Sequence, residues 1–131
     1  MNIHTIIPVH NRLKYTISII NCLRKQTIRN KLKIIVVDDG STDGTDIWLR
    51  NQTDIETLNG NGNLLWAGAI NLAIKNLSIK SKKTDWLLLI NNDVKIKNDY
   101  IETLYKIAKN NFPSAVGSIV KNNNEELISI G

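Results

Sequence analysis

Two polar clusters follow runs of apolar residues, and they contain the side chains best suited to chemistry. The first run, residues 32–37, ends at two adjacent carboxylates, Asp38 and Asp39. The second run, residues 86–90, is followed by two amides and a carboxylate: Asn91, Asn92 and Asp93. Carboxylate and amide oxygens accept hydrogen bonds and suit Mg²⁺ or Mn²⁺. We therefore expect a polar site here, with Asp93 as the metal candidate. Each acid could instead cap the turn after its run, which spacing alone leaves open.

The apolar runs and the segments between them predict a mostly parallel sheet flanked by helices. Uninterrupted Ile/Val/Leu runs are typical of strands buried on both faces, and ligands of such sheets bind at the carboxyl ends of the strands. Strands are expected at residues 3–9, 32–37, 55–58, 86–90, 115–120 and 127–130. Helices are expected at 13–26, from Thr42 or Asp43 to about 51, at 66–74, and after Asp99 with Glu102 in a capping box. This alternation predicts the α/β class.

Length and composition suit one intracellular domain. The chain has 131 residues, a formal net charge of +5 and one cysteine, Cys22, which can form no internal disulfide and is expected to pack as a small core residue in a reducing cytoplasm. No apolar run reaches the roughly 20 residues that span a bilayer, and the first expected strand leaves no room for a signal peptide.

Lysines are spread along the chain, and no basic stripe interleaved with aromatic residues is present, so we expect no nucleic-acid partner. The positive charge could favour an anionic ligand or membrane surface, or reflect a solvated exterior.

Four motifs in a fixed order resemble a known family. They are an Ile-Ile-Pro-Val-His-Asn-Arg segment, a Val-Val-Asp-Asp-Gly-Ser-Thr-Asp-Gly-Thr segment, an Asn/Gly stretch and an Asn-Asn-Asp triplet, at residues 6–12, 36–45, 59–63 and 91–93. The chain resembles family 2 glycosyltransferases, which have a Rossmann-like GT-A fold. The resemblance covers nearly the whole chain. Residues 62–71 and 91–94 are most similar to the rhamnosyltransferase-like branch.

The resemblance implies a site for the nucleotide of a sugar donor. The implied donor-binding residues are Pro8, His10, Asn11, Arg12, Asp38, Asp39, Asn63, Gly68, Asn71, Asn91 and Asn92. Asp39 would accept the N3–H of uracil or thymine, which both bases offer. Asp93 would hold a divalent Mg²⁺ or Mn²⁺ ion with the donor diphosphate. Asn91 stands where the family usually has the first Asp of an Asp-x-Asp motif, so metal binding is expected to depend more on the nucleotide.

The resemblance also implies inverting transfer of a sugar from a dTDP- or UDP-sugar, with dTDP-rhamnose as one candidate, to a glycan or lipid-linked acceptor. Bacterial envelope polysaccharide synthesis, at the inner face of the membrane with peripheral association, is the implied setting. The catalytic base is expected downstream of Gly131, because Glu125 and Glu126 lie in a polar turn. Residues 1–131 are thus expected to be one nucleotide-sugar-binding GT-A domain, the N-terminal part of a longer transferase. The sequence does not indicate an oligomeric state.

Two other functions are considered. A phosphoacceptor receiver domain also carries aspartates at strand ends, but its acidic pair follows the first strand, whereas here the pair follows the second. A nucleotide-sugar-binding module without catalysis fits the missing base, and binding without transfer would identify it. Trp66 borders the Asn/Gly stretch and could contact sugar or acceptor, whereas Trp48 and Trp86 are expected in the core.

Overall fold

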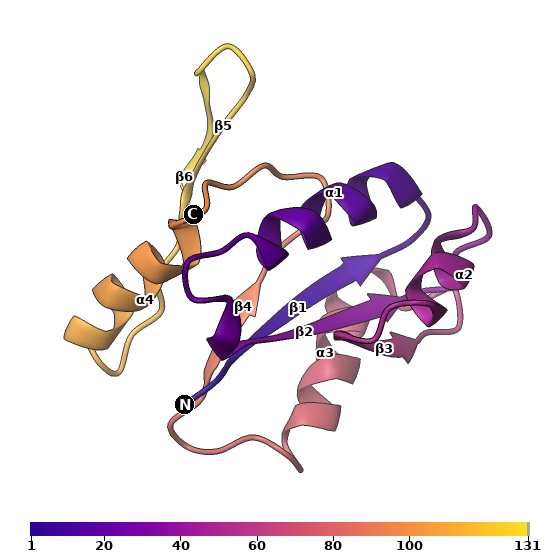
Figure 1. The fold of residues 1–131 in the computed structure, drawn as a ribbon, viewed down its shortest axis with the longest axis horizontal. Helices are drawn as coiled ribbons and strands as arrows, with labels where there is room; N and C mark the ends of the chain where they lie inside the picture. Colours follow the sequence, from indigo (N-terminus) through magenta and orange to yellow (C-terminus); the bar gives the residue numbers. More distant parts are fainter. Residues whose placement is uncertain (131) are drawn as a thin grey trace.

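A four-stranded parallel sheet forms the centre of the molecule, with helices on both faces (Figure 1). The computed structural model describes residues 1–130. The strand order is β3-β2-β1-β4. Their bounds are β1 Ile3–Val9, β2 Leu32–Asp38, β3 Ile55–Asn59 and β4 Trp86–Leu89. The predicted α/β class and parallel sheet are confirmed.

The helices alternate with the strands along the chain. They are α1 Leu13–Arg24, α2 Thr45–Arg50, α3 Leu65–Leu77 and α4 Tyr100–Asn110, with a short 3₁₀ turn η1 at Arg29–Lys31. The first helix ends two residues before its predicted end. Gln26 is buried, and its amide donates to the Lys97 carbonyl at 2.7 Å and accepts from the Ile101 amide at 3.0 Å. These bonds tie the chain after α1 to the start of α4.

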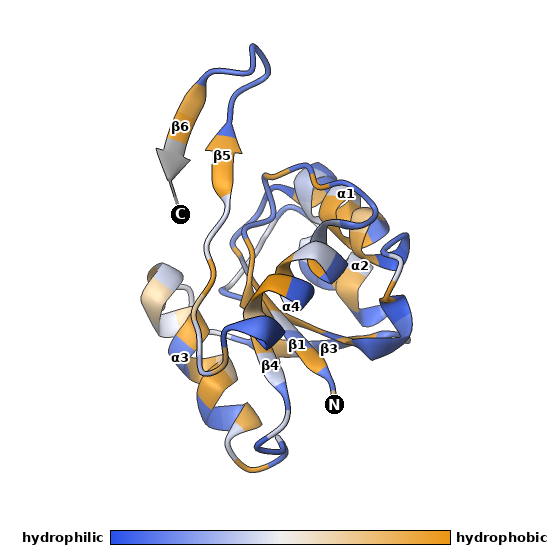
Figure 2. Ribbon diagram, turned by 90° about the vertical axis from the view of Figure 1, so that its left-hand side faces the viewer, coloured by the Kyte–Doolittle hydropathy of each residue, from blue (hydrophilic) through white to orange (hydrophobic). Residues whose placement is uncertain are grey.

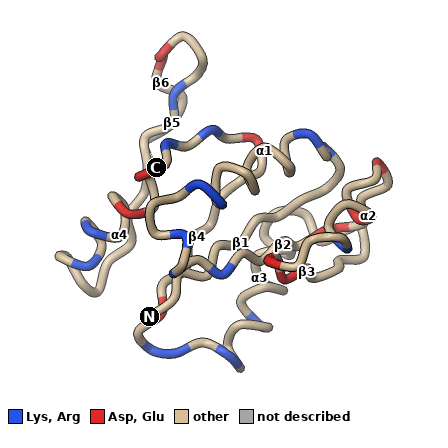
Figure 3. Tube along the Cα trace, viewed as in Figure 1, with Lys and Arg blue, Asp and Glu red and all other residues tan. Residues whose placement is uncertain are grey.

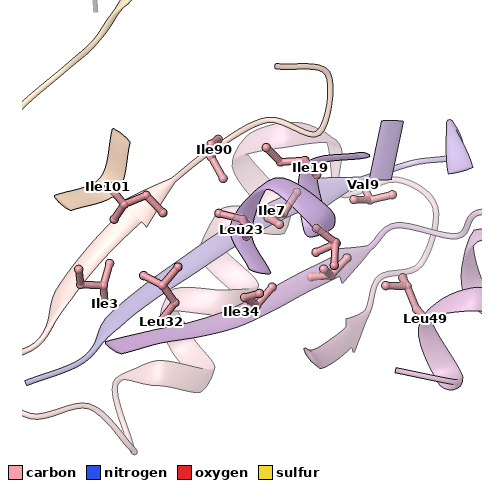
Figure 4. Close-up of a cluster of buried hydrophobic side chains, with 12 residues drawn as sticks. Ile3, Ile7, Val9, Ile19, Leu23, Leu32, Ile34, Leu49, Ile90 and Ile101 are labelled. Atoms are coloured by element: carbon pink, nitrogen blue, oxygen red, sulfur yellow. The ribbon is translucent and has the colours of Figure 1, made fainter. Parts of the chain in front are cut away.

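Alternate residues of the strands fill two cores, one on each face of the sheet. Ile7 of β1 and Ile34 of β2 belong to the cluster that α1 covers with Ile19 and Leu23 (Figure 4). The opposite faces of β1 and β2 pack against α3, in a cluster formed by Ile6, Ile35, Val37, Ala69, Ile70, Ala73 and Leu77. This double coverage explains why the strands carry apolar residues without polar alternation. Cys22, Trp48 and Trp86 are half-buried and pack against the first cluster, close to what was expected.

The predicted capping interactions at the starts of α2 and α4 are wrong. Gly44, with φ +92°, is the N-cap of α2, where Thr42 or Asp43 was expected. Asp99 is the N-cap of α4, but its side chain makes no capping hydrogen bond. The Glu102 carboxylate accepts from the Thr27 hydroxyl at 2.7 Å and pairs with Lys106, so the predicted capping box does not form. Side chains outside the first turn of α4 hold this carboxylate instead.

The last two strands form a hairpin that extends away from the sheet (Figures 1 and 2). β5, Ile119–Lys121, pairs antiparallel with β6, Leu127–Ile130. β6 lies where it was predicted, whereas β5 begins four residues later than expected, and residues 115–118 are irregular. Glu125 and Glu126 are exposed in the connecting turn, as expected.

Basic residues are distributed over helices and loops around the sheet (Figure 3). This agrees with the spread of lysines in the sequence. Within residues 1–130, none of the helices combines the length and the hydropathy of a membrane-spanning segment.

Candidate functional site

Three loops meet at the carboxyl edge of the sheet because β1 lies between β2 and β4. Asp38 is in register with Val9, and the Asp39 amide donates to the Val9 carbonyl at 2.8 Å. On the other side of β1, the Ile90 amide donates to the Ile6 carbonyl at 3.1 Å. The loops after β1, β2 and β4 therefore begin next to one another, as the sequence predicted for the two acidic strand ends.

Asp39 holds the loop between β3 and α3. Asp39 is only 6% exposed, and its carboxylate accepts hydrogen bonds from three backbone N–H groups. Gly62 donates to Oδ1 at 2.8 Å, while Leu64 and Leu65 donate to Oδ2 at 2.9 and 3.2 Å. Gly60 passes so close that a side chain there would collide with Oδ1. We call this arrangement, residues 60–65 around the Asp39 carboxylate, the Asp39 clamp.

The loop after β1 is joined to the loop after β2 by side-chain hydrogen bonds. His10 Nδ1 donates to the main-chain oxygen of Asp39 at 2.6 Å. Asn11, with φ +58°, donates its amide to Ser41 Oγ at 2.7 Å and accepts the Thr42 amide on Oδ1 at 2.8 Å. These bonds hold the His10 ring and the Asn11 backbone at the edge of the sheet.

The turn after Asp39 is fixed by two further carboxylates. Asp38 Oδ1 accepts the Ser41 amide at 3.1 Å, which closes the turn. Asp43 Oδ2 accepts the Leu13 amide at the start of α1, and its Oδ1 accepts both the amide and the hydroxyl of Thr45. The Thr45 hydroxyl is the main cause of a lowered pKa for the Asp43 carboxyl, with the Leu13 amide adding to it. Asp38 and Asp43 thus serve the backbone of this edge.

Asp93 is the open carboxylate of the site. Its side chain is 43% exposed, and its Oδ2 lies 3.2 Å from the Nη1 of Arg12, which donates to it. Arg12 itself has φ +63° and is the N-cap residue before α1. The exposed pair joins the loop after β1 to the loop after β4, and both charges remain accessible to an incoming ligand.

The two amides before Asp93 point to different partners. Asn92 is 8% exposed, and its Nδ2 donates to the Oγ1 of Thr16, a buried residue of α1, at 3.2 Å. Asn91 is exposed, and its Oδ1 accepts the indole N–H of Trp66 at 2.9 Å. Asn92 therefore anchors this loop to the core, while Asn91 fixes a tryptophan at the edge.

The remaining predicted residues lie around this edge without joining its hydrogen-bond network through their side chains. Pro8 is half-buried near the end of β1. Asn63 is exposed in the clamp loop, where its amide donates to Asn61 Oδ1 at 3.0 Å. Gly68 lies in the first turns of α3 against the Leu64 side chain, and Asn71 is exposed one turn further along.

A metal could be held here only with help from a ligand. Within residues 1–130, no group of three or more His, Cys, Asp or Glu side chains is placed to hold a metal ion. Asp93 offers one accessible carboxylate, and the Asn91 oxygen is already engaged by Trp66. One carboxylate plus phosphate oxygens is a common arrangement for Mg²⁺. The donor set fits an ion that arrives with a diphosphate.

Sequence reasoning missed the donors of the Asp39 clamp. The backbone amides of Gly62, Leu64 and Leu65 carry no side-chain signature, so only the Asn/Gly composition of residues 59–63 indicated a close approach. The sequence also gives no sign of the bond between Trp66 and Asn91, although it predicts that each residue borders the site.

Comparison with known proteins identifies the family. The model of the family described as "Glycosyl transferase family 2" matches residues 5–129. The chain belongs to glycosyltransferase family 2. Among curated proteins of this kind, "Glycosyltransferase GlyG" of Streptococcus pneumoniae is 31% identical over 108 residues, covering 79% of this chain and 34% of that protein. "Glycosyltransferase GlyA" of the same organism is 28% identical over 128 residues, covering 95% of this chain and 18% of that protein.

Solved structures of another protein share the fold. Staphylococcus aureus TarS superposes with a TM-score of 0.68 at 23% identity, over 84% of this chain and 20% of that chain. TarS 1-349 in complex with UDP gives a TM-score of 0.69 at 20% identity, over 96% of this chain and 43% of that chain. The fold is therefore of the GT-A type. This chain spans about a third of GlyG and about a fifth of GlyA.

Proposed function

We propose that the carboxyl edge of the sheet binds the nucleoside diphosphate of a sugar donor and that the chain is the donor-binding part of an inverting glycosyltransferase. The observation that carries the proposal is the meeting of the three predicted loops at one edge of a family 2 domain. Ligands of parallel sheets bind at this edge. The domain assignment, residues 1–131 as one nucleotide-sugar-binding unit, is part of the same proposal.

In this proposal Asp39 binds the base of the nucleotide through the one hydrogen-bond acceptor position that the Asp39 clamp leaves open. A carboxylate offers about four lone pairs, and three backbone N–H groups occupy three of them. The remaining position suits a single donor, such as the N3–H of uracil or thymine. Pro8, His10 and Asn11 would border the nucleoside, with Asp38 supporting the turn, while Asn63, Gly68 and Asn71 would line the other side.

Arg12 and Asp93 would meet the diphosphate. Asp93 would hold a divalent cation, Mg²⁺ or Mn²⁺, which when bound neutralises charge on the departing nucleoside diphosphate. Once Asp93 is engaged by the cation, the Arg12 guanidinium is free to donate to phosphate oxygens. Asn91 and Asn92 keep the loop neutral before Asp93, which leaves the cation dependent on the nucleotide.

The wider activity is proposed from the family. The sugar would be a hexose or deoxyhexose, with rhamnose as the candidate from the resemblance, and the acceptor a glycan or lipid-linked glycan of a bacterial envelope. Transfer would take place on the cytoplasmic side of the membrane, with peripheral association. An acceptor hydroxyl would attack the anomeric carbon while a carboxylate removes its proton. That base is expected downstream of Gly131.

A donor-binding module without transfer is the second candidate. Glu125 and Glu126 lie in the turn of the projecting hairpin, where Lys121 Nζ donates to Glu125 at 3.1 Å and Asn122 Nδ2 donates to Glu126 at 2.6 Å. Neither is placed by the sheet edge as a base. Donor binding with neither hydrolysis nor transfer to added glycans would identify this function.

The test is calorimetric titration of the chain with UDP, dTDP and GDP, each with and without Mn²⁺. We expect UDP or dTDP to bind with Mn²⁺, GDP to bind at least tenfold more weakly, and Asp93→Ala to lose the Mn²⁺ dependence. Asp99→Ala, which removes an exposed carboxylate that makes no capping bond, is the control. Failure of every nucleotide to bind would contradict the proposal.

A further inference from the structure

The side chain of Trp66 spans the edge from the Asp39 clamp to the loop after β4. Its neighbour Leu65 donates its backbone N–H to Asp39 Oδ2 at 3.2 Å. The Trp66 indole N–H donates to Asn91 Oδ1 at 2.9 Å, two residues before Asp93. Trp66 is therefore fixed at both ends, by its backbone neighbour at the β2 side and by its ring at the β4 side.

The backbone before Trp66 is held in an unfavourable conformation. Leu65 has φ +55° although it is a bulky residue, and it is 79% exposed, so no burial of its side chain compensates for that backbone. Strain of this kind persists where surrounding bonds over-determine it, and it is concentrated at binding sites. Here the two bonds to Asp39 Oδ2 impose the turn that directs the indole across the edge.

The indole is exposed but has no free hydrogen-bonding group. Trp66 is 52% exposed, and its only polar atom is spent on Asn91. What it offers a ligand is apolar ring surface. At the same time, the Asn91 oxygen has lost one of its two acceptor positions to the indole.

We propose that Trp66 is the floor under the pentose of the bound nucleotide, and that its bond to Asn91 makes the site accept 2′-deoxyribose at least as well as ribose. The inference rests on the proposed function. If the base lies at Asp39 and the diphosphate at Asp93, the pentose must lie between them, where the indole is held. An apolar floor gives a 2′-hydroxyl no acceptor of its own, and a site of this kind does not reject a sugar that lacks the hydroxyl. The site therefore admits thymidine-type donors, whose pentose lacks the 2′-hydroxyl, as well as uridine-type donors.

UDP and dUDP test this inference because they differ only in the 2′-hydroxyl. With Mn²⁺ present, calorimetry should give dUDP an affinity equal to or higher than that of UDP. Trp66→Ala should weaken both by about three- to tenfold, the usual loss for an aromatic contact. Trp66→Phe keeps a ring but frees the Asn91 oxygen, so UDP should gain about threefold or more over dUDP.

The ratio of the two affinities separates recognition from folding. A general loss of structure would weaken UDP and dUDP together in Trp66→Phe and leave their ratio unchanged, which would overturn the inference. Trp48→Phe, in α2, is the matched control and should leave both affinities and their ratio unchanged. A wild-type preference for UDP of threefold or more would also overturn it, with the proposed function intact. If wild type binds neither nucleotide, both proposals fail.

Discussion

The loops after β2 and β4 both place aspartate at the carboxyl edge, yet they use the carboxylate in opposite ways. Asp39 is 6% exposed and accepts three backbone N–H groups from the loop before α3. The Asp93 side chain is 43% exposed and contacts one charged partner, the exposed Arg12 side chain. The first carboxylate therefore mainly supports the protein, whereas the second is available to a ligand. Similar residues at similar strand ends can thus differ in role because different backbone reaches them.

Asp39→Ala should produce the largest loss of stability among these variants. A small loss would contradict the contrast drawn between Asp39 and Asp93. Removing the carboxylate leaves the amides of Gly62, Leu64 and Leu65 without their acceptor in a site closed to much of the solvent. We expect a loss of about 2–4 kcal/mol in the free energy of unfolding. Urea denaturation followed by circular dichroism measures it.

Asp39→Asn sharpens this result. The amide oxygen can accept two of the three N–H groups, but its NH₂ would face another donor, so a smaller loss of about 1–3 kcal/mol is expected. Asp99→Ala is the control, because it removes an exposed carboxylate at the N-cap of α4 that makes no capping hydrogen bond, and it should cost under about 1 kcal/mol. Equal stability of wild type and Asp39→Ala would show that the clamp does not hold the loop.

Two glycines of the clamp should respond differently to alanine. At Gly60 a methyl group would overlap Asp39 Oδ1 and the Leu64 side chain, and a loss of about 1–3 kcal/mol is expected from this crowding. At Gly62 a methyl group meets open space, but φ is +85°, so the cost is conformational and about 1 kcal/mol. Thermal melts of the two variants compare them.

Nucleotide binding separates the two glycines further. Gly60→Ala displaces the carboxylate that the base would reach and should weaken UDP binding, whereas Gly62→Ala leaves the carboxylate in place. If Gly62→Ala weakened UDP binding more than Gly60→Ala did, the backbone of residue 62, and not the Asp39 carboxylate, would be the part that ligands sense.

The strands and the location of the site were predictable because they depend on patterns local to the sequence. Uninterrupted apolar runs specify strands covered on both faces, and polar residues directly after them must lie at the carboxyl edge. The cluster of Asp38, Asp39 and Asp93 around the loop after Val9 follows from that rule together with the central place of β1.

The roles within the site were less predictable, because they depend on contacts between distant segments. The loop at residues 60–65 decides whether the Asp39 carboxylate binds backbone or ligand. Every residue of that loop has a backbone N–H, so the sequence does not mark the ones that reach Asp39.

The partners of Glu102 were unpredictable for the same reason. Its position suggested a capping box, but Thr27 and Lys106 reach its carboxylate instead, and the first of these lies 75 residues away. The late start of β5 reflects a hairpin that pairs only with itself, so no sheet extends its first strand.

Asn91 and Asn92 show the same contrast between an exposed and a buried side chain within one loop. Asn92→Ala removes a buried hydrogen bond to Thr16, and we expect a loss of about 1–2 kcal/mol. Asn91→Ala removes an exposed bond to Trp66 and should change stability by under about 0.5 kcal/mol. Chemical denaturation of both variants measures the difference. A larger loss for Asn91 would mean that the indole tether supports the fold and not a ligand.

Asp93→Ala should have the smallest effect on stability and a clear effect on binding. Exposed ion pairs contribute little, so losing the contact with Arg12 should change the free energy of unfolding by under about 0.5 kcal/mol. The same variant should remove the Mn²⁺ dependence of nucleotide binding. Arg12→Ala breaks the same ion pair while keeping the carboxylate, and should therefore retain the Mn²⁺ dependence with weaker overall affinity. If Arg12→Ala lost the metal dependence and Asp93→Ala kept it, the open carboxylate would not be the cation ligand, and the contrast with Asp39 would concern exposure alone.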